Sequence, residues 1–592
     1  MSADLGHYVG VHSAAGRLVV QPRMGMADPE AMAAGIAAVA GLDCPTVATV
    51  TIDSYTRVGD HAAATRALRS GAALNGFPIV SHGPERTALV AAAAGDDVPV
   101  QVRHGSARPG AILAAAAEAG LSASEGGPVS YCLPYGRTPL VESVSQWADA
   151  TAMFGELVAD RGGRAHLETF GGCLLGQLCP PSLLIATSVL ESLFFVQHGL
   201  RSVSLSYAQQ THPVQDIEAL AALDQLASEL LPNDVDRHIV LYTYMGVFPR
   251  RVAGARSLLA DSARIAVLGG AQRLIVKTET EAHRIPTVAE NLAALTAAAD
   301  WAAHARRDTD LPDRHAVDFS QVLDEARTLV QAVLALSPDV GRALVQAFAS
   351  GTLDVPYCLH ADNAGQSRGA IDADGRLYWA HAGRMPVRIP AGRRATAVTS
   401  GGLLRMLNHT AERHDRALPP SAGTEGVADL DRARALRDRE SVSEPVRIAI
   451  VGSGPRGLSV LERLAARADQ APDAPAAEVW LIDDVEVGCG RIWRTDQSTW
   501  LLMNTAASEV TMFSGPPDDG PARAGAGPSL GQWWVDADPR NADPEGYAPR
   551  AVYGRYLRFV LEALERTAPV RVLVHRVLGR VVDVVNAGAR RR

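Results

Sequence analysis

The chain has 592 residues, of which 47% are hydrophobic and 20% charged, which is ordinary for a globular protein of two or more domains. A net charge of −9 without a long basic stripe argues against a nucleic-acid partner. The six cysteines show neither CxxC nor metal-ligand spacing and the N-terminus carries no export signal, so we expect a cytoplasmic protein without a metal site. The most apolar stretch, 171–196, is interrupted by Pro180-Pro181 and Glu191, so we expect no membrane span.

Over the first 285 residues, short β-branched runs alternate with Ala- and Leu-rich amphipathic stretches. We expect strands at 46–52, 77–81, 98–103, 128–132, 164–168, 202–207, 238–243 and 272–277. This alternation predicts an α/β fold, and eight strands fit a (β/α)8 TIM barrel, although an open doubly wound sheet could also hold them. Helices near 287–305 and 319–349 and an irregular Gly-rich segment form a helical C-terminal extension, so this first domain covers 1–410.

Polar residues stand at the predicted strand ends or in the loops that follow them. They are Arg57, Arg103, Tyr131, Glu168, Tyr207, Tyr242 and Lys277. In a barrel, the carboxyl ends of the strands converge on one mouth, where barrel enzymes place their chemistry. Any one of these residues could be an ordinary surface or paired loop residue, but the set as a whole favours a barrel with an active site at its mouth.

A second pattern begins after 411–445, a stretch rich in Asp, Arg, Ala and Ser that we expect to be a linker. The run VRIAIV at 446–451 predicts a strand, a Gly-rich turn and a helical stretch follow it, and a second predicted strand ends at Asp483. The turn contains Gly452, Gly454 and Gly457 in GxGxxG spacing, which permits close approach of a pyrophosphate to a helix N-terminus, while the acid can bind a ribose hydroxyl. A Gly-rich turn in an unrelated α/β unit is the alternative. We expect a partial Rossmann-like dinucleotide-binding domain over 446–592.

Several blocks of the first domain resemble the barrel (E, or epsilon) subunit of glutamate mutase, the adenosylcobalamin-dependent methylaspartate mutase. The blocks are QPRMG (21–25), TIDSYTR (51–57), LNGFPIVSHG (74–83), VQVRHG (100–105), SEGGPVSYCLPY (124–135), ETFGG (168–172) and IVKTETEA (275–282). They stand in the family's order, which makes the resemblance specific. It implies a radical carbon-skeleton isomerase that converts L-glutamate to threo-3-methyl-L-aspartate.

The resemblance also implies roles for individual residues. Three arginines would form a claw around the substrate's two carboxylates, namely Arg23, Arg57 and Arg103. Guanidinium groups suit this task because they bind carboxylates bidentately and with fixed direction. Further substrate contacts would come from Glu125, Tyr131 and Tyr135, the lining of the radical site from Glu168 and Phe170, and contacts to the cofactor's adenosyl ribose from Lys277 and Glu281.

The chain departs from the family at a few positions. A family histidine is Tyr242 here, a tryptophan is Tyr244, and the arginine that usually precedes Glu168 is Leu167. The claw stays intact, so these changes bear on the identity of the substrate and on the rate rather than on the substrate class.

Partners follow from the same resemblance. Cobalamin-binding domains of mutases present Asp-x-His-x-x-Gly, but after Asp236-Arg-His238 and Asp313-Arg-His315 no glycine stands in the required position. We therefore expect a separate small cobalamin-binding subunit to hold most of the cofactor, and the barrel subunit to form a homodimer.

The C-terminal segment resembles the first part of a family of FAD/NAD(P)-binding proteins through GSGPRGLSVLERL (452–464), GRIWRTDQ (490–497), LLMNT (501–505) and PRAVYGRYL (549–557). This implies FAD or NAD(P) as a second cofactor. From Val446 to the last residue the segment is shorter than a complete flavoprotein of that kind, so it is either cut short or a remnant with a non-catalytic role.

Two alternatives to a glutamate mutase remain. The barrel could serve a biosynthetic pathway with another 2-amino dicarboxylate as substrate, a reading that the fused redox-type domain motivates. Alternatively, the protein could be a scaffold that binds nucleotide and amino acid without catalysis, which would require a broken claw or adenosyl contact.

Overall fold

The computed structural model describes most of the chain. The described residues are 2–71, 74–134, 136–170, 178–249, 251–281, 285–307, 309–389, 400–416, 446–470, 475–498, 501–513, 527–544, 546–569 and 571–583. The chain divides into two compact units, Met1–Ser421 and Ala422–Arg592, and each is described by itself. Of the predicted linker 411–445, residues 411–416 belong to a helix, and 417–445 lie outside the described residues.

The first unit is built on one sheet of eight parallel strands. They are β1 (Val19–Gln21), β2 (Ala48–Thr51), β3 (Val100–Arg103), β4 (Ala123–Glu125), β5 (His166–Glu168), β6 (Ser202–Ala208), β7 (Asp236–Tyr242) and β8 (Arg273–Ile275). From β2 to β8 each strand pairs with the next along the chain, and β1 pairs with β8. A parallel bridge between Val20 and Thr46, just before β2, brings the two ends of the sheet together. The predicted α/β fold with a TIM-type barrel is therefore confirmed.

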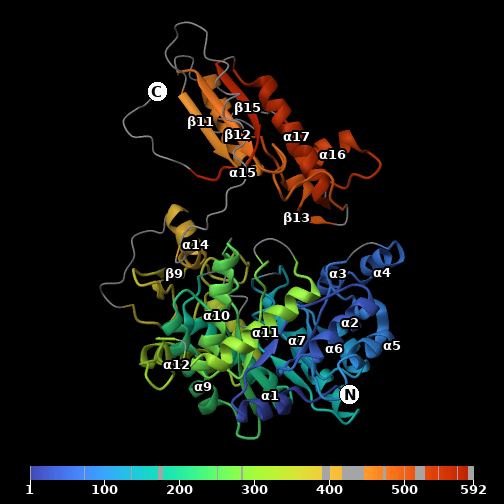
Figure 1. The fold of residues 1–592 in the computed structure, drawn as a ribbon, viewed down its shortest axis with the longest axis vertical. Helices are drawn as coiled ribbons and strands as arrows, with labels where there is room; N and C mark the ends of the chain where they lie inside the picture. The colour runs from blue at the N-terminus through green and yellow to red at the C-terminus, as the bar shows by residue number, and fades with distance from the viewer. Residues whose placement is uncertain are drawn as a thin grey trace. The chain divides into compact units, whose positions relative to one another are not determined.

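Helices surround this sheet, as Figure 1 shows. They are α1 (Leu5–Ala14), α2 (Pro29–Ala40), α3 (Ser54–Val58), α4 (His61–Arg69), α5 (Ile79–Ala92), α6 (Gly110–Glu118), α7 (Leu140–Ala159), α8 (Pro181–Gln197), α9 (Pro213–Leu230), α10 (Val252–Gly269) and α11 (Val288–His304). The helical extension contains α12 (Ser320–Leu334), α13 (Val340–Ser350), the hairpin β9 (Arg368–Ile371) and β10 (Leu377–His381), and α14 (Ser400–Arg416). Strands such as β6 are buried along their whole length, as expected for a parallel sheet covered by helices.

Two of the predicted strands are wrong, and two real strands were not predicted. The run 77–81 contributes only a bridge between Phe77 and Ile52, and α5 begins at Ile79 directly after Pro78. The run 128–132 is a turn whose amides bind a side chain instead of a neighbouring strand. The missed strands β1 and β4 have three residues each, too few for an alternating pattern to be visible.

The second unit contains a parallel sheet in the order β11–β12–β15. Its elements are β11 (Val446–Val451), α15 (Pro455–Gln470), β12 (Ala477–Asp483), β13 (Leu502–Ala506), the 3-10 turn Ala507–Glu509, α16 (Leu530–Ala537), β14 (Tyr547–Pro549), α17 (Arg550–Thr567) and β15 (Val572–Leu578). The predicted strand, Gly-rich turn, helix and strand are all present, and Figure 1 shows β11, β12 and β15 side by side. Across the described parts of both units, no helix is long and apolar enough to cross a membrane.

Candidate active site

The register of the barrel brings the predicted site residues to one end of the sheet. Neighbouring strands β4 and β5 align Glu125 with Glu168, so two carboxylates meet at their carboxyl ends. Strands β1 and β8 pair Gln21 with Ile275, and Arg23 and Lys277 each follow two residues later. Arg23, expected before the first strand, therefore comes after it and belongs to the mouth.

The buried side chains of Arg103 and Glu125 are in direct contact at this end. Their Nη2 and Oε2 atoms are 2.7 Å apart, and both side chains are at most 4% exposed. Tyr131 donates a hydrogen bond to the other oxygen of Glu125. Gly126 is required beside them, since it has a φ of +128° and a Cβ there would lie 2.5 Å from the Tyr131 ring. The mouth thus holds a fixed guanidinium and a carboxylate from adjacent strands.

Tyr242 connects Glu125 to Glu168. Its hydroxyl oxygen is 2.9 Å from Glu125 Oε2 and also within hydrogen-bond distance of Glu168 Oε1. Arg103 lies over the Tyr242 ring, 5.0 Å from its centroid, and 5.8 Å from that of Phe170. The ring of Phe170 packs against Tyr131 and Tyr242 at 4.9 and 5.1 Å. We call Arg103, Glu125, Tyr131, Phe170 and Tyr242 the mouth cluster.

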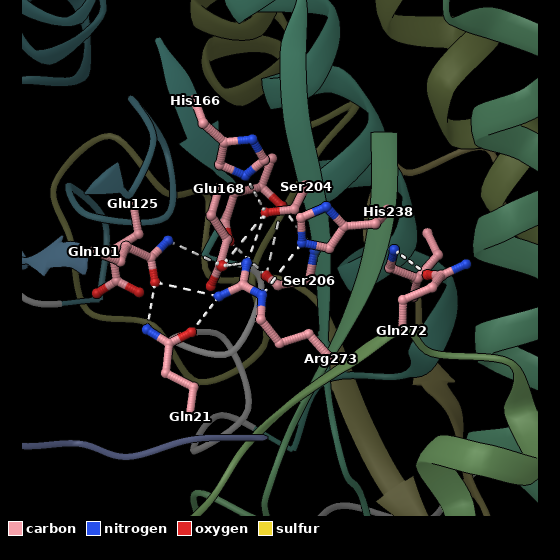
Figure 2. Close-up of polar contacts among 12 residues, drawn as sticks. Gln21, Gln101, Glu125, His166, Glu168, Ser204, Ser206, His238, Gln272 and Arg273 are labelled. Carbon is pink, nitrogen blue, oxygen red and sulfur yellow. Dashed lines mark hydrogen bonds and ion pairs between the residues drawn. The ribbon is translucent and has the colours of Figure 1, made fainter. Parts of the chain in front are cut away.

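A second polar cluster lies deeper in the barrel, around Arg273 (Figure 2). The Arg273 side chain is fully buried, and its five N–H groups reach Glu168, Ser204, Gln21, Gln101 and His238. Gln21 in turn donates to Gln101 at 2.7 Å, and His166 bonds Ser204 at 2.9 Å. We call Arg273 and these five partners the Arg273 cluster. It fixes the Glu168 carboxylate from below the mouth.

Burial and these charges set the ionisation of the acids. Burial raises the pKa of the Glu125 carboxyl, and Arg103 only partly opposes this effect. Burial alone would also raise the pKa of Glu168, but Arg273 and Arg103 together hold it below its usual value. Burial, helped by Arg57, lowers the pKa of His104 to about 3, so that this histidine beside the mouth is neutral. The two carboxyls, close in space, therefore differ in their tendency to carry a proton.

The other two arginines predicted to bind substrate have less direct contact with the mouth cluster. Arg57, on α3, is exposed and donates through Nε to the backbone oxygen of His104 at 3.0 Å. The helix that carries it begins at Asp53, whose carboxylate accepts the amides of Tyr55 and Thr56 at 2.9 and 3.1 Å. Arg23 is 40% exposed and lies 3.9 Å from Glu281. The claw thus has one buried and two exposed arginines before a ligand is bound.

Lys277 and Glu281 form the remaining group. Lys277 Nζ is 2.9 Å from Glu281 Oε1 and 5.4 Å from the centre of the Phe248 ring. Burial lowers the pKa of Lys277, and Glu281 partly offsets this. The predicted substrate contact Tyr135 lies outside the described residues.

Sequence reasoning missed two signals. Arg273, Ile275 and Lys277 alternate along one strand, so a charged Arg273 had to face the barrel interior together with Lys277. In addition, Lys277 is the only lysine of the chain, whereas arginine fills all 55 other basic positions among its 56 Lys and Arg residues. Lysine differs from arginine in carrying a compact ammonium in place of a planar fork.

The second unit positions its glycines as a nucleotide-binding turn requires. Gly452 has a φ of +93°, and a Cβ on Gly457 would lie 2.1 Å from the Gly452 carbonyl oxygen, so helix and strand pack closely only with glycine there. Asp483 is buried, and its Oδ2 accepts hydrogen bonds from the amide and hydroxyl of Ser453 at 2.9 and 3.0 Å. Asp483 is therefore the last residue of β12 and also holds the Gly-rich turn in place. In neither unit do the described residues contain a cluster of three His, Cys, Asp or Glu side chains able to hold a metal ion.

A parallel barrel with a buried arginine, two carboxylates and a lysine at the carboxyl ends of its strands has the form of an enzyme that acts on a small charged molecule. Comparison with known families makes this specific. Residues 5–395 match the family described as methylaspartate mutase E chain (MutE), and the chain belongs to this family. Residues 449–592 match the FAD-NAD(P)-binding family, so the second unit is a domain of that kind.

Similar proteins include several glutamate mutase epsilon subunits. That of Halobacterium salinarum is 35% identical over 336 residues, which are 55% of this chain and 69% of the relative. That of Desulfitobacterium hafniense is 32% identical over 349 residues, or 57% of this chain and 71% of the relative. That of Escherichia coli O157:H7 is 30% identical over 350 residues, or 57% and 72%. All of these belong to an isomerase family, and the fused domain lies beyond the matched region.

Proposed function

We propose that the barrel catalyses the adenosylcobalamin-dependent interconversion of L-glutamate and threo-3-methyl-L-aspartate. The observation that carries the proposal is the state of Arg103. One terminal nitrogen of its guanidinium pairs with Glu125, while the other, Nη1, is buried and has no hydrogen-bond partner among the described residues. An unpartnered buried guanidinium nitrogen costs free energy, and a substrate carboxylate would remove that cost.

The neighbours of Arg103 suit the rest of an amino-acid substrate. Glu125 would accept hydrogen bonds from the ammonium group, and Tyr131, already bonded to Glu125, would keep that carboxyl in place. Exposed Arg23 and Arg57 would close on the second carboxylate. Phe170 would shield the reacting carbons from water, which matters because stray hydrogen donors would consume a radical.

The residues near Lys277 fit an adenosyl group. A buried ammonium and a carboxylate 2.9 Å apart provide both a donor and an acceptor for ribose hydroxyls. Adenosylcobalamin, when bound, supplies the radical that removes a hydrogen atom from the substrate. Lys277 and Glu281 would hold its adenosyl end and orient it toward the mouth cluster.

In this proposal, another protein chain binds the corrin end of adenosylcobalamin. His238, the histidine of one incomplete cobalt-binding motif, is buried and accepts a hydrogen bond from Arg273 at 3.2 Å. It is therefore committed to the barrel interior. A small cobalamin-binding subunit would provide the cobalt ligand, and a homodimer of barrel chains would complete the assembly.

Reconstitution tests this function. The purified chain is mixed with a small cobalamin-binding mutase subunit and adenosylcobalamin, and glutamate and methylaspartate are followed by chromatography. We expect turnover in the mixture, and neither turnover nor tight cobalamin binding by the chain alone. Stoichiometric cobalamin binding by the isolated chain, measured by visible absorbance, would contradict the division of labour between subunits.

For the second unit we propose binding of an adenine dinucleotide, FAD or NAD(P), through Gly452, Gly454, Gly457 and Asp483. Gly457→Ala should abolish the affinity because its Cβ would meet the Gly452 carbonyl 2.1 Å away. Gly579→Ala is the matched control, since the nearest atom to a Cβ there is 4.0 Å away. Calorimetric titration with FAD, NAD and NADP separates the ligands, and no heat with any of them in the wild type would show that the glycine turn is vestigial.

A second candidate is the same reaction type on another 2-amino dicarboxylate in a biosynthetic pathway. The observation in its favour is Tyr242, which stands where the family carries a histidine and which contacts both carboxylates of the site. Turnover of a panel of dicarboxylic amino acids distinguishes the two. A substrate preferred over glutamate would favour the second candidate.

A further inference from the structure

The hydrogen bonds of Tyr242 do not balance if both neighbouring carboxyls are ionised. The phenol carries one proton and can therefore donate to one acceptor only. Yet its oxygen lies 2.9 Å from Glu125 Oε2 and is also in contact with Glu168 Oε1. Two carboxylate oxygens facing a single proton leave one contact as a repulsion between lone pairs, inside a part of the barrel where every residue involved is at most 2% exposed.

We propose that Glu125, Tyr242 and Glu168 hold one additional proton in the substrate-free barrel, so that Glu125 donates to Tyr242 and Tyr242 donates to Glu168. In this arrangement every contact is a hydrogen bond. Glu125 still accepts from Tyr131 at Oε1 and from Arg103 at Oε2. Tyr242 acts as a positioning residue that fixes both carboxyls relative to each other.

The surrounding charges place the proton on Glu125. Glu168 faces Arg273, Gln101 and Ser204, which all donate to its Oε2, and this stabilises the anion. Glu125 faces a single cation, Arg103, and the nearby His104, which packs against Tyr131, is neutral. The direction of the shifts agrees, since the pKa of Glu125 is raised by burial and that of Glu168 is lowered by the arginines.

This arrangement gives the mouth and the Arg273 cluster together a net positive charge. Arg103 and Arg273 are cations. When Glu125 is protonated, Glu168 is the only anion among these residues. The inference rests on the proposed function in one respect: a substrate carboxylate would pair with Arg103, and the substrate ammonium would displace the proton from Glu125 into solvent. Binding of a zwitterionic amino acid should therefore release one proton.

Infrared spectroscopy of the full chain tests the resting state without substrate or cobalamin. Protonated carboxyl groups absorb in a carbonyl region that is free of carboxylate bands. Buried Glu191 and Asp216 contribute there as well, because burial raises their pKa to about 7 and about 8. Glu125→Gln is therefore compared with Glu191→Gln and Asp216→Asn, so that each band is assigned by its loss in one variant.

The expected result is a band at neutral pH that disappears in Glu125→Gln, persists in both control variants, and shifts to higher frequency in Tyr242→Phe, where its O–H loses the acceptor. No band assignable to Glu125 would overturn the proposal. A Glu125 band that Tyr242→Phe leaves unchanged would overturn the bridge through Tyr242. Circular dichroism and melting of Tyr242→Phe establish that the variant is folded.

Calorimetry of glutamate binding provides the second arm. The binding enthalpy is measured in buffers that differ in ionisation enthalpy, and the slope gives the protons released. We expect release of about one proton by the wild type and much less by Glu125→Gln. If glutamate does not bind, the proposed function fails, and the infrared spectra still show whether Glu125 carries the additional proton. If glutamate binds without proton release, the proton assignment is wrong and the proposed function stands.

Discussion

Arg273 and Arg103 are two buried arginines on the inner face of one barrel, and they differ in how their donors are used. All N–H groups of Arg273 have partners, from Glu168, Ser204, His238 and two glutamines. Arg103 contacts Glu125 through Nη2 and leaves Nη1 without a hydrogen-bond partner among the described residues. Both side chains are at most 4% exposed, so solvent does not account for the difference.

The comparison separates a structural charge from a binding charge. A buried guanidinium with a complete set of acceptors holds strands together, and nothing is gained by adding an anion. A buried guanidinium with an open donor is stabilised further when an anion arrives. Glu168 and Glu125 mirror this contrast, since the first is held ionised and the second has a raised pKa. The mouth cluster is therefore prepared for a ligand, and the Arg273 cluster supports it.

The largest expected effect is loss of stability in Arg273→Met. The variant leaves the Glu168 charge buried without its main partner, which costs about 3–5 kcal/mol of unfolding free energy. Arg103→Met should cost clearly less, because Glu125 can remain neutral by keeping a proton. Denaturant unfolding of both variants measures the difference. Equal losses in the two variants would remove the distinction between the clusters.

Lys277→Ala should impair turnover more than substrate binding, since its ammonium is expected to hold the adenosyl ribose. Loss of a charge-assisted hydrogen bond is worth roughly 1.5–3 kcal/mol, or about ten- to a hundredfold. Lys277→Arg is the matched variant, because it keeps the charge but not the compact shape. The reconstituted enzyme is assayed for kcat, and an unchanged kcat in Lys277→Ala would show that the adenosyl contact lies elsewhere.

Arg103→Lys tests whether the unpartnered N–H donor of Arg103 binds the substrate. Lysine keeps the charge but cannot offer the planar fork, so kcat/KM for glutamate should fall at least tenfold, about 1.4 kcal/mol. We also expect the wild type to prefer five-carbon dicarboxylic amino acids strongly over glutamine, whose neutral amide leaves one claw arginine unpaired. Steady-state kinetics of the reconstituted enzyme measure both. Equal acceptance of glutamine and glutamate would refute the dicarboxylate assignment.

Sequence patterns predicted the long buried strands of this barrel and failed on the short ones. Strands β6 and β7 have seven residues each, with serines alternating with larger residues in β6 and an apolar run at the end of β7. In contrast, β1 and β4 are three-residue segments whose positions follow only from pairing with neighbours. Local propensity cannot detect such strands, because closure of the barrel, a long-range constraint, creates them. The run 128–132 was predicted to be a strand. Two of its amides instead donate hydrogen bonds of 2.9 Å to Glu191 on α8.

The sequence named candidate residues for the site but not the contacts among them. Family resemblance supplied Arg103, Glu125 and Lys277, and the structure adds how they are joined. Tyr242 was expected at the mouth and noted as a departure from the family, but its position between two carboxylates was not predicted, because it depends on the register of β4, β5 and β7. Arg273 was read only as part of a strand. Its alternation with Lys277 places it on the inner face but does not give the identity of its partners, which come from other strands.

The smallest expected effect, counted per pH unit, is a pH dependence of stability. It contrasts Asp216, an acid that contacts no cation among the described residues, with Glu168, which is paired with Arg273. Asp216 is buried, accepts hydrogen bonds from the Gln210 amide and the Tyr207 hydroxyl at 2.9–3.0 Å, and burial raises its pKa from 3.8 to about 8. Between these values the folded state keeps a proton that the unfolded state releases, so the unfolding free energy should fall as pH rises from about 4 to about 8, by at most about 1.4 kcal/mol per pH unit for one proton. Asp216→Asn should flatten that slope, whatever its absolute stability, and Glu191→Gln should remove only the separate contribution of Glu191. Denaturant unfolding across this range measures the slopes. A wild-type slope that Asp216→Asn leaves unchanged would mean that Asp216 is ionised in the folded barrel, and that hydrogen bonds without a cation suffice to hold a buried carboxylate there.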